Sequence, residues 1–140
     1  MRKLLIPVDG SKNCDRAIGH VINLAKEHAP VEVHLLNVQP PFSGDIATFI
    51  DKKTLDDFRE EQGTKVLQSV RAALDDAEVA YTSHIGVGDI AETIVSYVRE
   101  HNIDEVVMGT RGLGSIGSLL LGSVATKVIH LSPAPVTLIK

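Results

Sequence analysis

The sequence predicts an open, doubly wound α/β domain, with a five-stranded parallel sheet and helices on both of its faces. Two observations predict this fold. Short apolar runs of strand length alternate with longer segments whose apolar residues recur at helical spacing. This alternation is typical of parallel strands that are connected by helical crossovers. The strand-length runs are also apolar almost without interruption, which is typical of strands buried on both faces. With 140 residues, the chain is predicted to be a single domain spanning residues 1–140.

The first half of the chain is predicted to hold two strands and a helix, followed by a long loop. The first strand, residues 3–9, ends in a turn whose Ser11 can cap the next helix. Pro30 ends that helix. The apolar residues at helical spacing within it are Ile18, Val21, Ile22 and Ala25. A second strand covers residues 31–38. Residues 39–54 have no regular pattern, and a loop of that length is usually a lid or a binding loop.

The second half continues the alternation of helices and strands. The second helix is predicted to bury a face made of Leu55, Phe58, Val66, Val70 and Leu74. Residues 79–87 alternate as the third strand, and Asp89 with Glu92 forms a capping box for the third helix. The inward residues of that helix are predicted to be Ile90, Ile94, Val95 and Val98. The fourth strand covers residues 105–109, and a last helix leads to the fifth strand, residues 136–139, at an edge of the sheet.

Composition excludes several classes of protein. The balance of 14 Lys and Arg against 18 Asp and Glu gives a net charge of −4, which argues against nucleic acid as a partner. A lone cysteine, Cys14, cannot form an internal disulfide. The longest uncharged stretch, residues 112–126, has 15 residues and is shorter than the roughly 18 apolar residues of a membrane span. The first apolar run is broken at once by Pro7, so no signal peptide and a cytoplasmic location are expected.

The segment after the fourth strand is the most informative about a ligand. Ligands of open α/β sheets bind beyond the carboxyl ends of the strands, where the strand order reverses. Five glycines within residues 109–122 would let backbone N–H groups approach a ligand, and a phosphate at the start of the last helix would meet the helix dipole. No acidic residue follows Glu105, whereas Arg111, Lys127 and Lys140 are basic. These features predict an anionic ligand.

Two common nucleotide-binding templates do not fit this segment. Residues 112–117 spell G-x-G-x-x-G, but they follow the fourth strand, and no acidic residue lies downstream to bind a ribose. The glycine pairs with the spacing of a Walker A loop lack its lysine. We therefore expect neither a dinucleotide fingerprint nor a P-loop.

A third pattern fits. Gly109, two residues, Gly112, nine residues and then Gly122-Ser123 resemble the G-2x-G-9x-G-S/T nucleotide loop of the universal stress protein family. The resemblance covers the whole chain. Its other segments are residues 6–11, 88–92, 104–112 and 132–136. It implies a Rossmann-like fold of the adenine-nucleotide alpha-hydrolase type, and membership of the subgroup that binds ATP, or ADP or AMP.

Carried over position by position, the resemblance implies a set of binding residues. Beside the nucleoside it puts Pro7, Val8 and Asp9, and against the adenine it puts Val38. Around the ribose and phosphates it puts Met108, Gly109, Arg111, Gly112, Gly122, Ser123 and Val124. Asp9 is expected either to accept a hydrogen bond from a ribose hydroxyl or to be an outer partner of Mg²⁺ bound to the phosphates. We expect no catalytic residue, and no metal site made by protein ligands alone.

These observations favour an ATP-binding regulatory protein of the stress response, without robust catalysis, that acts on an unknown partner protein. One alternative is a slow or partner-stimulated ATPase or nucleotidyl transferase, and another is a non-catalytic partner-binding module. The family resemblance also implies a dimer joined through the last strand. We therefore predict a homodimer whose interface includes residues 136–139. Ser123 could also cap the last helix, and Cys14 is expected to be a passive thiol rather than a nucleophile.

Overall fold

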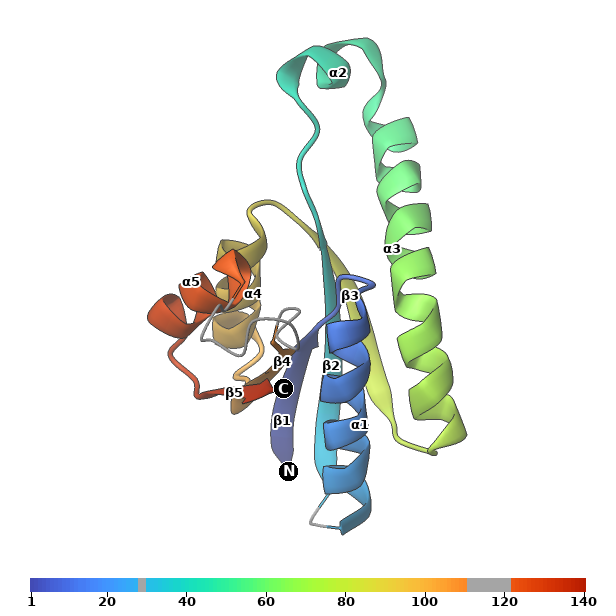
Figure 1. Ribbon diagram of the computed structural model, residues 1–140. Helices are drawn as coiled ribbons and strands as arrows, with labels where there is room; N and C mark the ends of the chain where they lie inside the picture. The colour runs from blue at the N-terminus through green and yellow to red at the C-terminus, as the bar shows by residue number, and fades with distance from the viewer. Residues whose placement is uncertain (28–29, 111–121) are drawn as a thin grey trace.

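Five parallel strands form one sheet in the order β3-β2-β1-β4-β5 (Figure 1). They are β1 (Arg2–Pro7), β2 (Val31–Gln39), β3 (Tyr81–Val87), β4 (Glu105–Gly109) and β5 (Val136–Ile139). The computed structural model of the chain describes residues 1–27, 30–110 and 122–140. In the register of the sheet, Leu4 of β1 lies between Val33 of β2 and Glu105 of β4. The predicted parallel sheet is confirmed, and β5 lies at its edge, as expected.

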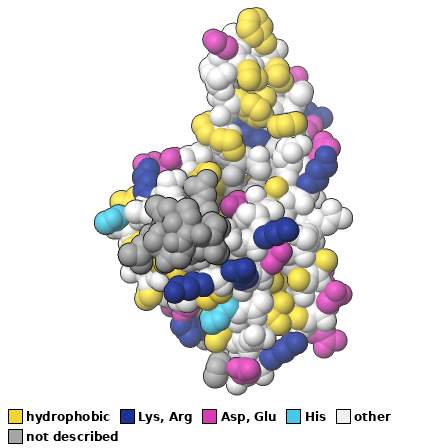
Figure 2. Space-filling model, viewed as in Figure 1, with side chains coloured by type: hydrophobic (Ala, Val, Ile, Leu, Met, Phe, Trp, Pro, Cys, Tyr) yellow, Lys and Arg dark blue, Asp and Glu magenta, His cyan; other side chains and the backbone are white. Residues whose placement is uncertain are grey.

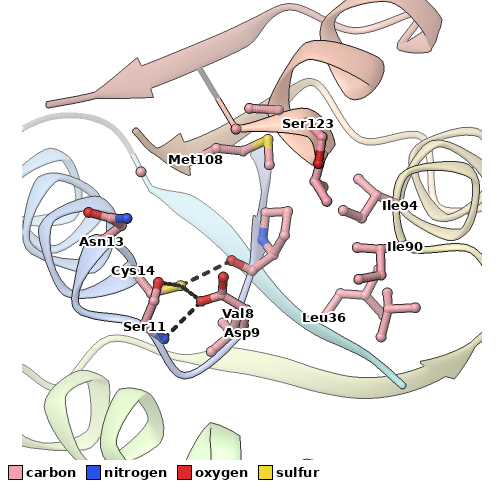
Figure 3. Close-up of a pocket in the computed structure, with 16 residues that line it drawn as sticks. Val8, Asp9, Ser11, Asn13, Cys14, Leu36, Ile90, Ile94, Met108 and Ser123 are labelled. Carbon is pink, nitrogen blue, oxygen red and sulfur yellow. Dashed lines mark hydrogen bonds between the residues drawn. The ribbon is translucent and has the colours of Figure 1, made fainter. Parts of the chain in front are cut away.

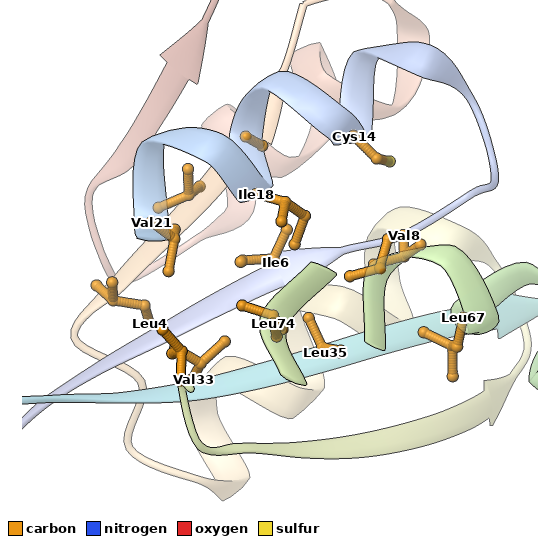
Figure 4. Packing of buried hydrophobic residues seen from close by; sticks show 14 residues of the cluster. Leu4, Ile6, Val8, Cys14, Ile18, Val21, Val33, Leu35, Leu67 and Leu74 are labelled. Atoms are coloured by element: carbon orange, nitrogen blue, oxygen red, sulfur yellow. The ribbon is translucent and has the colours of Figure 1, made fainter. Parts of the chain in front are cut away.

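Helices cover both faces of this sheet. On one face lie α1 (Lys12–Glu27) and α3 (Lys52–Asp76), and on the other lie α4 (Ile90–Glu100) and α5 (Ser123–Leu131). Side chains of a strand alternate between the two faces, so β1 serves two cores. Leu4 and Ile6 pack with α1 and α3 (Figure 4), whereas Leu5 packs with α4 and α5. All three are completely buried, which explains the uninterrupted apolar run.

The order of the strands reverses between β1 and β4. From β1 the chain crosses through α1 to β2 and then to β3 on one side, and it later returns to β4 on the other side of β1. Because the order reverses there, a crevice is expected at the carboxyl ends of these two strands.

Residues 39–54 differ from the predicted irregular loop. They contain the short helix α2 (Gly44–Phe49), and α3 already begins at Lys52. The signal was a cap: the side chain of Asp51 accepts a hydrogen bond of 2.7 Å from the N–H of Thr54. Together, α2 and the first turns of α3 project from the body of the protein (Figures 1 and 2). The predicted irregular loop is therefore a helical projection.

Two residues predicted to point inward are exposed. Phe58, on the projecting part of α3, is 47% exposed because the sheet does not extend beneath it. Ile90, at the start of α4, is 39% exposed because it borders the open crevice at the carboxyl ends of the strands. The third strand begins at Tyr81 rather than residue 79, since the chain still turns at Glu78, which has a φ of 58°. The predicted cap of α4 is confirmed: Asp89 accepts a hydrogen bond of 3.0 Å from the N–H of Glu92. Among the described helices, none has the length and apolar character to cross a bilayer.

Candidate functional site

A pocket of about 470 Å³ occupies the crevice at the carboxyl ends of β1 and β4 (Figure 3). This volume lies within the range of small-molecule sites. Nine of the eleven predicted binding residues line it: Pro7, Val8, Asp9, Val38, Met108, Gly109, Gly122, Ser123 and Val124. The other two, Arg111 and Gly112, lie outside the described residues. The topology therefore brings together four segments that are far apart in the sequence.

The turn after β1 holds the acidic group of the pocket. Oδ1 of Asp9 accepts hydrogen bonds from the N–H of Ser11, at 2.8 Å, and from the Sγ of Cys14, at 3.2 Å. Gly10, which lies between Asp9 and Ser11 in the sequence, has a φ of +83°, a backbone conformation that residues with a side chain disfavour. The carboxylate of Asp9, more than the hydroxyl of Ser11, thus organises the turn into α1.

The ionisation of this turn follows from those contacts. Burial raises the pKa of Asp9, but the hydrogen bonds from Ser11 and Cys14 outweigh it and hold that pKa below its ordinary value of 3.8. Burial, together with the charge of Asp9, raises the pKa of Cys14 to about 11. At neutral pH the site therefore contains a carboxylate and a protonated thiol that donates to it. This supports the expectation of a passive thiol, because a helix dipole that lowered the thiol pKa would produce the opposite shift.

Buried amides fix the neighbouring end of β2. The side chain of Asn37 donates a hydrogen bond of 2.8 Å to the carbonyl of Val8, and Gln39 donates one of 2.6 Å to the Oδ1 of Asn37. Val8 in turn donates its N–H to the carbonyl of Leu36, at 2.8 Å. Hydrogen bonds within the protein therefore hold the ends of β1 and β2 together at the pocket.

One wall of the pocket is apolar. Leu36 and Val38 project from β2 on the face covered by α4, and Ile90 and Ile94 lie one turn apart on that helix (Figure 3). Across the pocket lie Ser11, Asn13 and Cys14, from the turn and the first residues of α1. The pocket is therefore suited to a ligand that has a flat apolar group for the apolar wall and polar groups for the opposite wall.

At the end of β4, the missing side chain of Gly109 has a structural cause. A Cβ at this position would lie 2.2 Å from the backbone oxygen of Asn13, in the first turn of α1. The first glycine of the predicted nucleotide loop therefore lets α1 and β4 approach each other, whatever else it does.

The N-terminus of α5 faces the pocket without a side-chain cap. Gly122 is the N-cap residue and makes no side-chain hydrogen bond, and the first turn carries no acidic residue. Ser123, predicted as a possible cap, is instead the first residue of the helix. The first N–H groups of a helix lack partners within it and carry its positive dipole end, so this turn is suited to an anion.

Lys127 does not contribute its charge as the sequence suggested. Its Nζ lies 3.2 Å from Asp89, the N-cap residue of α4, and 3.6 Å from Glu92, in the first turn of that helix. It therefore joins α5 to α4 beside the pocket. Its pKa is raised by these contacts, first by the hydrogen bond with Asp89.

Sequence reasoning did not assign several lining residues to the site. They are Ser11, Asn13, Cys14, Leu36, Ile90, Ile94 and Ala125. Two signals could have found some of them: Leu36 precedes Val38 by two residues on the same face of a strand, and Ile94 follows Ile90 by one helical turn. The choice of helices that flank the pocket depends on the strand order, which the sequence left open. In the part of the chain that the structure describes, no group of three His, Cys, Asp or Glu side chains is placed to hold a metal ion.

Comparison with known proteins places this geometry in context. The model of the Universal stress protein family matches residues 1–140. Universal stress protein MJ0531 of Methanocaldococcus jannaschii is 32% identical over 141 residues, which cover 99% of this chain and 82% of the relative. Among solved structures, that of protein MJ0577, a universal stress protein of the same organism, has a TM-score of 0.79 at 29% identity and covers 99% of this chain and 95% of its own. A family protein of Arabidopsis thaliana, solved with AMP bound, has a TM-score of 0.72 over 100% of this chain and 92% of its own; at 21% identity it shows the shared fold.

Proposed function

The chain belongs to the universal stress protein family, and we propose that it is a regulatory member that binds ATP, or ADP or AMP, without robust catalysis of its own. The observation that carries this proposal is the pocket at the strand reversal, where an apolar wall faces a carboxylate turn and an uncapped helix N-terminus. An adenine nucleotide has the matching parts: a flat base, a ribose and phosphates.

The wall and the helix suggest an orientation for the nucleotide. The base fits between Val38 of β2 and the isoleucines of α4, and the phosphates fit against the first turn of α5, at Ser123 and Val124. The solved Arabidopsis protein of this fold holds AMP, which supports an adenine nucleotide as the ligand class.

Mg²⁺ fits this site as a companion of the phosphates. Asp9 is the acidic side chain among the described residues that line the pocket, and Mg²⁺ is commonly held by one or two carboxylates together with phosphates and water. The two hydrogen bonds that Asp9 accepts within the turn both end on Oδ1, so Oδ2 is the oxygen available for a ribose hydroxyl or a hydrated ion. When bound, the ion would neutralise phosphate charge near this carboxylate.

The chemistry of the pocket supports binding without fast turnover. Phosphoryl transfer needs a group that positions or deprotonates the nucleophile. The pKa of Asp9 lies below its ordinary value, so its carboxylate is a weak base, and Cys14 is protonated at neutral pH because its pKa is about 11. A slow or partner-stimulated ATPase or nucleotidyl transferase is the alternative, and turnover well above once per minute that disappears in Asp9→Asn would establish it.

The decisive experiment is titration calorimetry of nucleotide-free protein with ATP, ADP and AMP, with and without Mg²⁺. The test variant is Gly122→Val, because Gly122 has φ −62° and ψ 155°, which valine also adopts, so the new side chain should fill the pocket rather than unfold the helix. The matched control is Gly44→Val, where a Cβ meets nothing within 4 Å. We expect binding by the wild-type chain and the control, and at least a tenfold loss in Gly122→Val. Absence of binding at sub-millimolar nucleotide would end the proposal.

Asp9→Asn separates the two roles open to Asp9. Asparagine keeps the oxygen that accepts the Ser11 N–H but removes the charge. A role with the ribose predicts weaker binding of AMP without metal, whereas a role with Mg²⁺ predicts weaker binding of ATP only when Mg²⁺ is present.

We further propose a homodimer through β5. All four residues of this edge strand are half-buried, and an apolar edge invites pairing with another strand. Light scattering at micromolar concentration should give twice the chain mass of 15.1 kDa. Leu138→Pro should reduce it to one chain mass, because the N–H of Leu138 lies on the side of β5 away from β4, whereas the carbonyls of Pro135 and Ile139 bond to β4 and the residue after it. A wild-type monomer would contradict the dimer. If Gly122→Val lost nucleotide but kept its cellular role, the non-catalytic partner-binding module would be favoured instead.

A further inference from the structure

The exposed apolar side chains of this fold are concentrated on one projection. We define the arm as residues 42–61, which comprise α2 and the first turns of α3 and project beyond the carboxyl edge of the sheet (Figure 1). Of the nine large hydrophobic residues that are exposed in the described part of the chain, four lie on the arm: Ile46 (43%), Phe49 (88%), Ile50 (39%) and Phe58 (47%). Figure 2 shows hydrophobic side chains gathered over this projecting part. Apolar surface collected in this way marks an interaction site more often than single exposed residues do.

The arm is a built structure. The rings of Phe42 and Phe58 lie 5.7 Å apart, and the guanidinium of Arg59 lies 4.8 Å from the centre of the Phe42 ring. Arg59 also lies 3.6 Å from Asp56, and the cap at Asp51 starts α3. These contacts connect the chain after β2 to α3, so the arm presents its apolar side chains from a fixed base.

The face of α2 that carries these side chains has no partner among the described residues. Ile46 and Phe49 have the i, i+3 spacing that puts side chains on one side of a helix, and Ile50 is the C-cap residue directly after them. In a helix that packs on its own sheet this side would be buried, but here all three are exposed. These three side chains therefore form an exposed apolar surface of the kind that packs against a partner.

The charges of the arm indicate which kind of partner fits. The arm has six acidic residues and three basic ones, a net charge of −3. The acidic residues, all exposed, are Asp45, Asp51, Asp56, Asp57, Glu60 and Glu61. Of the basic residues, Lys52, Lys53 and Arg59, the last is engaged with Asp56 and Phe42. A second arm would bring like charges together, and an anionic membrane surface would be repelled, so charge complementarity selects a basic partner.

We infer that the arm is a docking surface for a basic amphipathic helix of a partner protein. The apolar side of such a helix would cover Ile46, Phe49 and Phe58. Its Lys and Arg residues would pair with the acidic residues in the first turns of α3. This surface shares no residue with the lining of the nucleotide pocket, so the inference stands whether or not the chain binds a nucleotide.

The test uses the full chain and a synthetic 18-residue peptide of leucine and lysine with leucines at i, i+3, i+4 and i+7. One control peptide has glutamate in place of every lysine, and another has the same leucines and lysines in an order without helical spacing. Fluorescence anisotropy of the labelled peptides gives the dissociation constants. We expect the Leu/Lys helix to bind and both control peptides to bind at least about tenfold more weakly.

Variants then locate the binding surface. Phe49→Ser removes the most exposed side chain of the arm and should weaken peptide binding about tenfold or more. The matched control is Ile129→Ser on α5, where the native side chain is 41% exposed and lies outside the arm. The charge variant is Asp57→Lys with Glu60→Lys, and its control is Asp75→Lys with Asp76→Lys, an equal change of charge at the other end of α3. Circular dichroism confirms that each variant is folded, and the charge pair tests the surface independently of Phe49.

Each outcome has a definite meaning. Loss of peptide binding in Phe49→Ser and in the Asp57 and Glu60 pair, with both controls unchanged, supports the inference. Equal binding by the wild-type chain and Phe49→Ser, or equal binding of the Leu/Glu peptide, overturns it. Self-association that Phe49→Ser abolishes, or binding to anionic phospholipid vesicles stronger than to the peptide, also overturns it, because the occupant would be a second copy or a membrane.

Discussion

Replacing Gly109 with alanine should destabilise the protein, because the position has no room for a methyl group. The new Cβ would lie 2.2 Å from the backbone oxygen of Asn13, 2.6 Å from its carbonyl carbon and 2.8 Å from its Cβ. Two of these three atoms belong to the backbone of α1, so rotation of a side chain cannot relieve the contact. Either the first turn of α1 or the end of β4 has to move.

The size of the effect follows from that movement. Bringing the shortest contact from 2.2 Å to 3.0 Å, below which real Cβ atoms essentially never lie, opens the gap by 0.8 Å. The helix that must shift is anchored by buried Ala17, Ile18 and Val21. Overpacking of this kind costs about 1–3 kcal/mol, and because backbone atoms are involved we expect about 2 kcal/mol.

The assay is urea denaturation of the nucleotide-free protein. With a denaturant slope of about 2 kcal/mol per molar, a loss of about 2 kcal/mol lowers the midpoint by roughly 1 M. The control is Gly19→Ala in the middle of α1, where a Cβ meets nothing within 4 Å. Alanine is the better helix former by about 1 kcal/mol, so this variant should be more stable than the wild type.

The result that would refute the reasoning is an unchanged midpoint in Gly109→Ala. The close approach of α1 to β4 would then not constrain this position. If the same variant lost nucleotide affinity at wild-type stability, the glycine would serve the ligand alone. Lower stability with unchanged affinity, once the folded fraction is accounted for, would assign it to packing alone.

Three further predictions concern polar groups that take part in hydrogen bonds. Tyr97→Phe should cost about 1–3 kcal/mol in urea denaturation, because the Tyr97 hydroxyl lies 2.9 Å from Nδ1 of buried His34, whereas Tyr81→Phe, whose hydroxyl meets an exposed arginine at 3.4 Å, should be close to neutral. Alkylation of Cys14 by iodoacetamide at about pH 8 should be on the order of 100-fold slower in the folded chain than in urea, because its pKa is about 11 rather than that of a free thiol; equal rates would contradict the burial of the thiol. The charge of Asp9 should stabilise the fold at neutral pH relative to Asp9→Asn, because its pKa in the folded chain lies below 3.8. The difference between the urea midpoints of the two proteins should persist down to about pH 5, begin to fall as the pH approaches 3.8, and vanish only below the folded-state pKa.

The sheet could be predicted because its signal is local. The bounds of β4 and β5 agree with the predicted residues 105–109 and 136–139, since each strand is a short apolar run between polar or turn residues. The cap of α4 was readable for the same reason: Asp89 and Glu92 interact across three residues.

The arm could not be predicted because its projection depends on how long α3 is relative to the strands on which it packs. Helix α3 has 25 residues, roughly 37 Å, whereas β3 has seven, roughly 23 Å. The helix therefore extends past the sheet, and Phe58, which continues the apolar periodicity, has no strand beneath it. Helix α2 was missed because it has only six residues, which is too short a segment for apolar spacing to distinguish a helix from a loop.

The site is the place where the two cores of the protein meet. Val8 and Cys14 belong to the core under α1 and α3, whereas Leu36, Ile94 and Ala125 belong to the core under α4 and α5. The sheet separates these cores everywhere else, and only beyond the ends of β1 and β4 can one molecule contact both. Helix α5 has nine residues, a length at which an isolated helix is not stable, and a cation of its own already joins it to α4. An anion bound at its first turn would add to that support through the helix dipole. A ligand bound here would therefore contact the two halves of the fold at once, which is what the regulatory binding role that we propose requires.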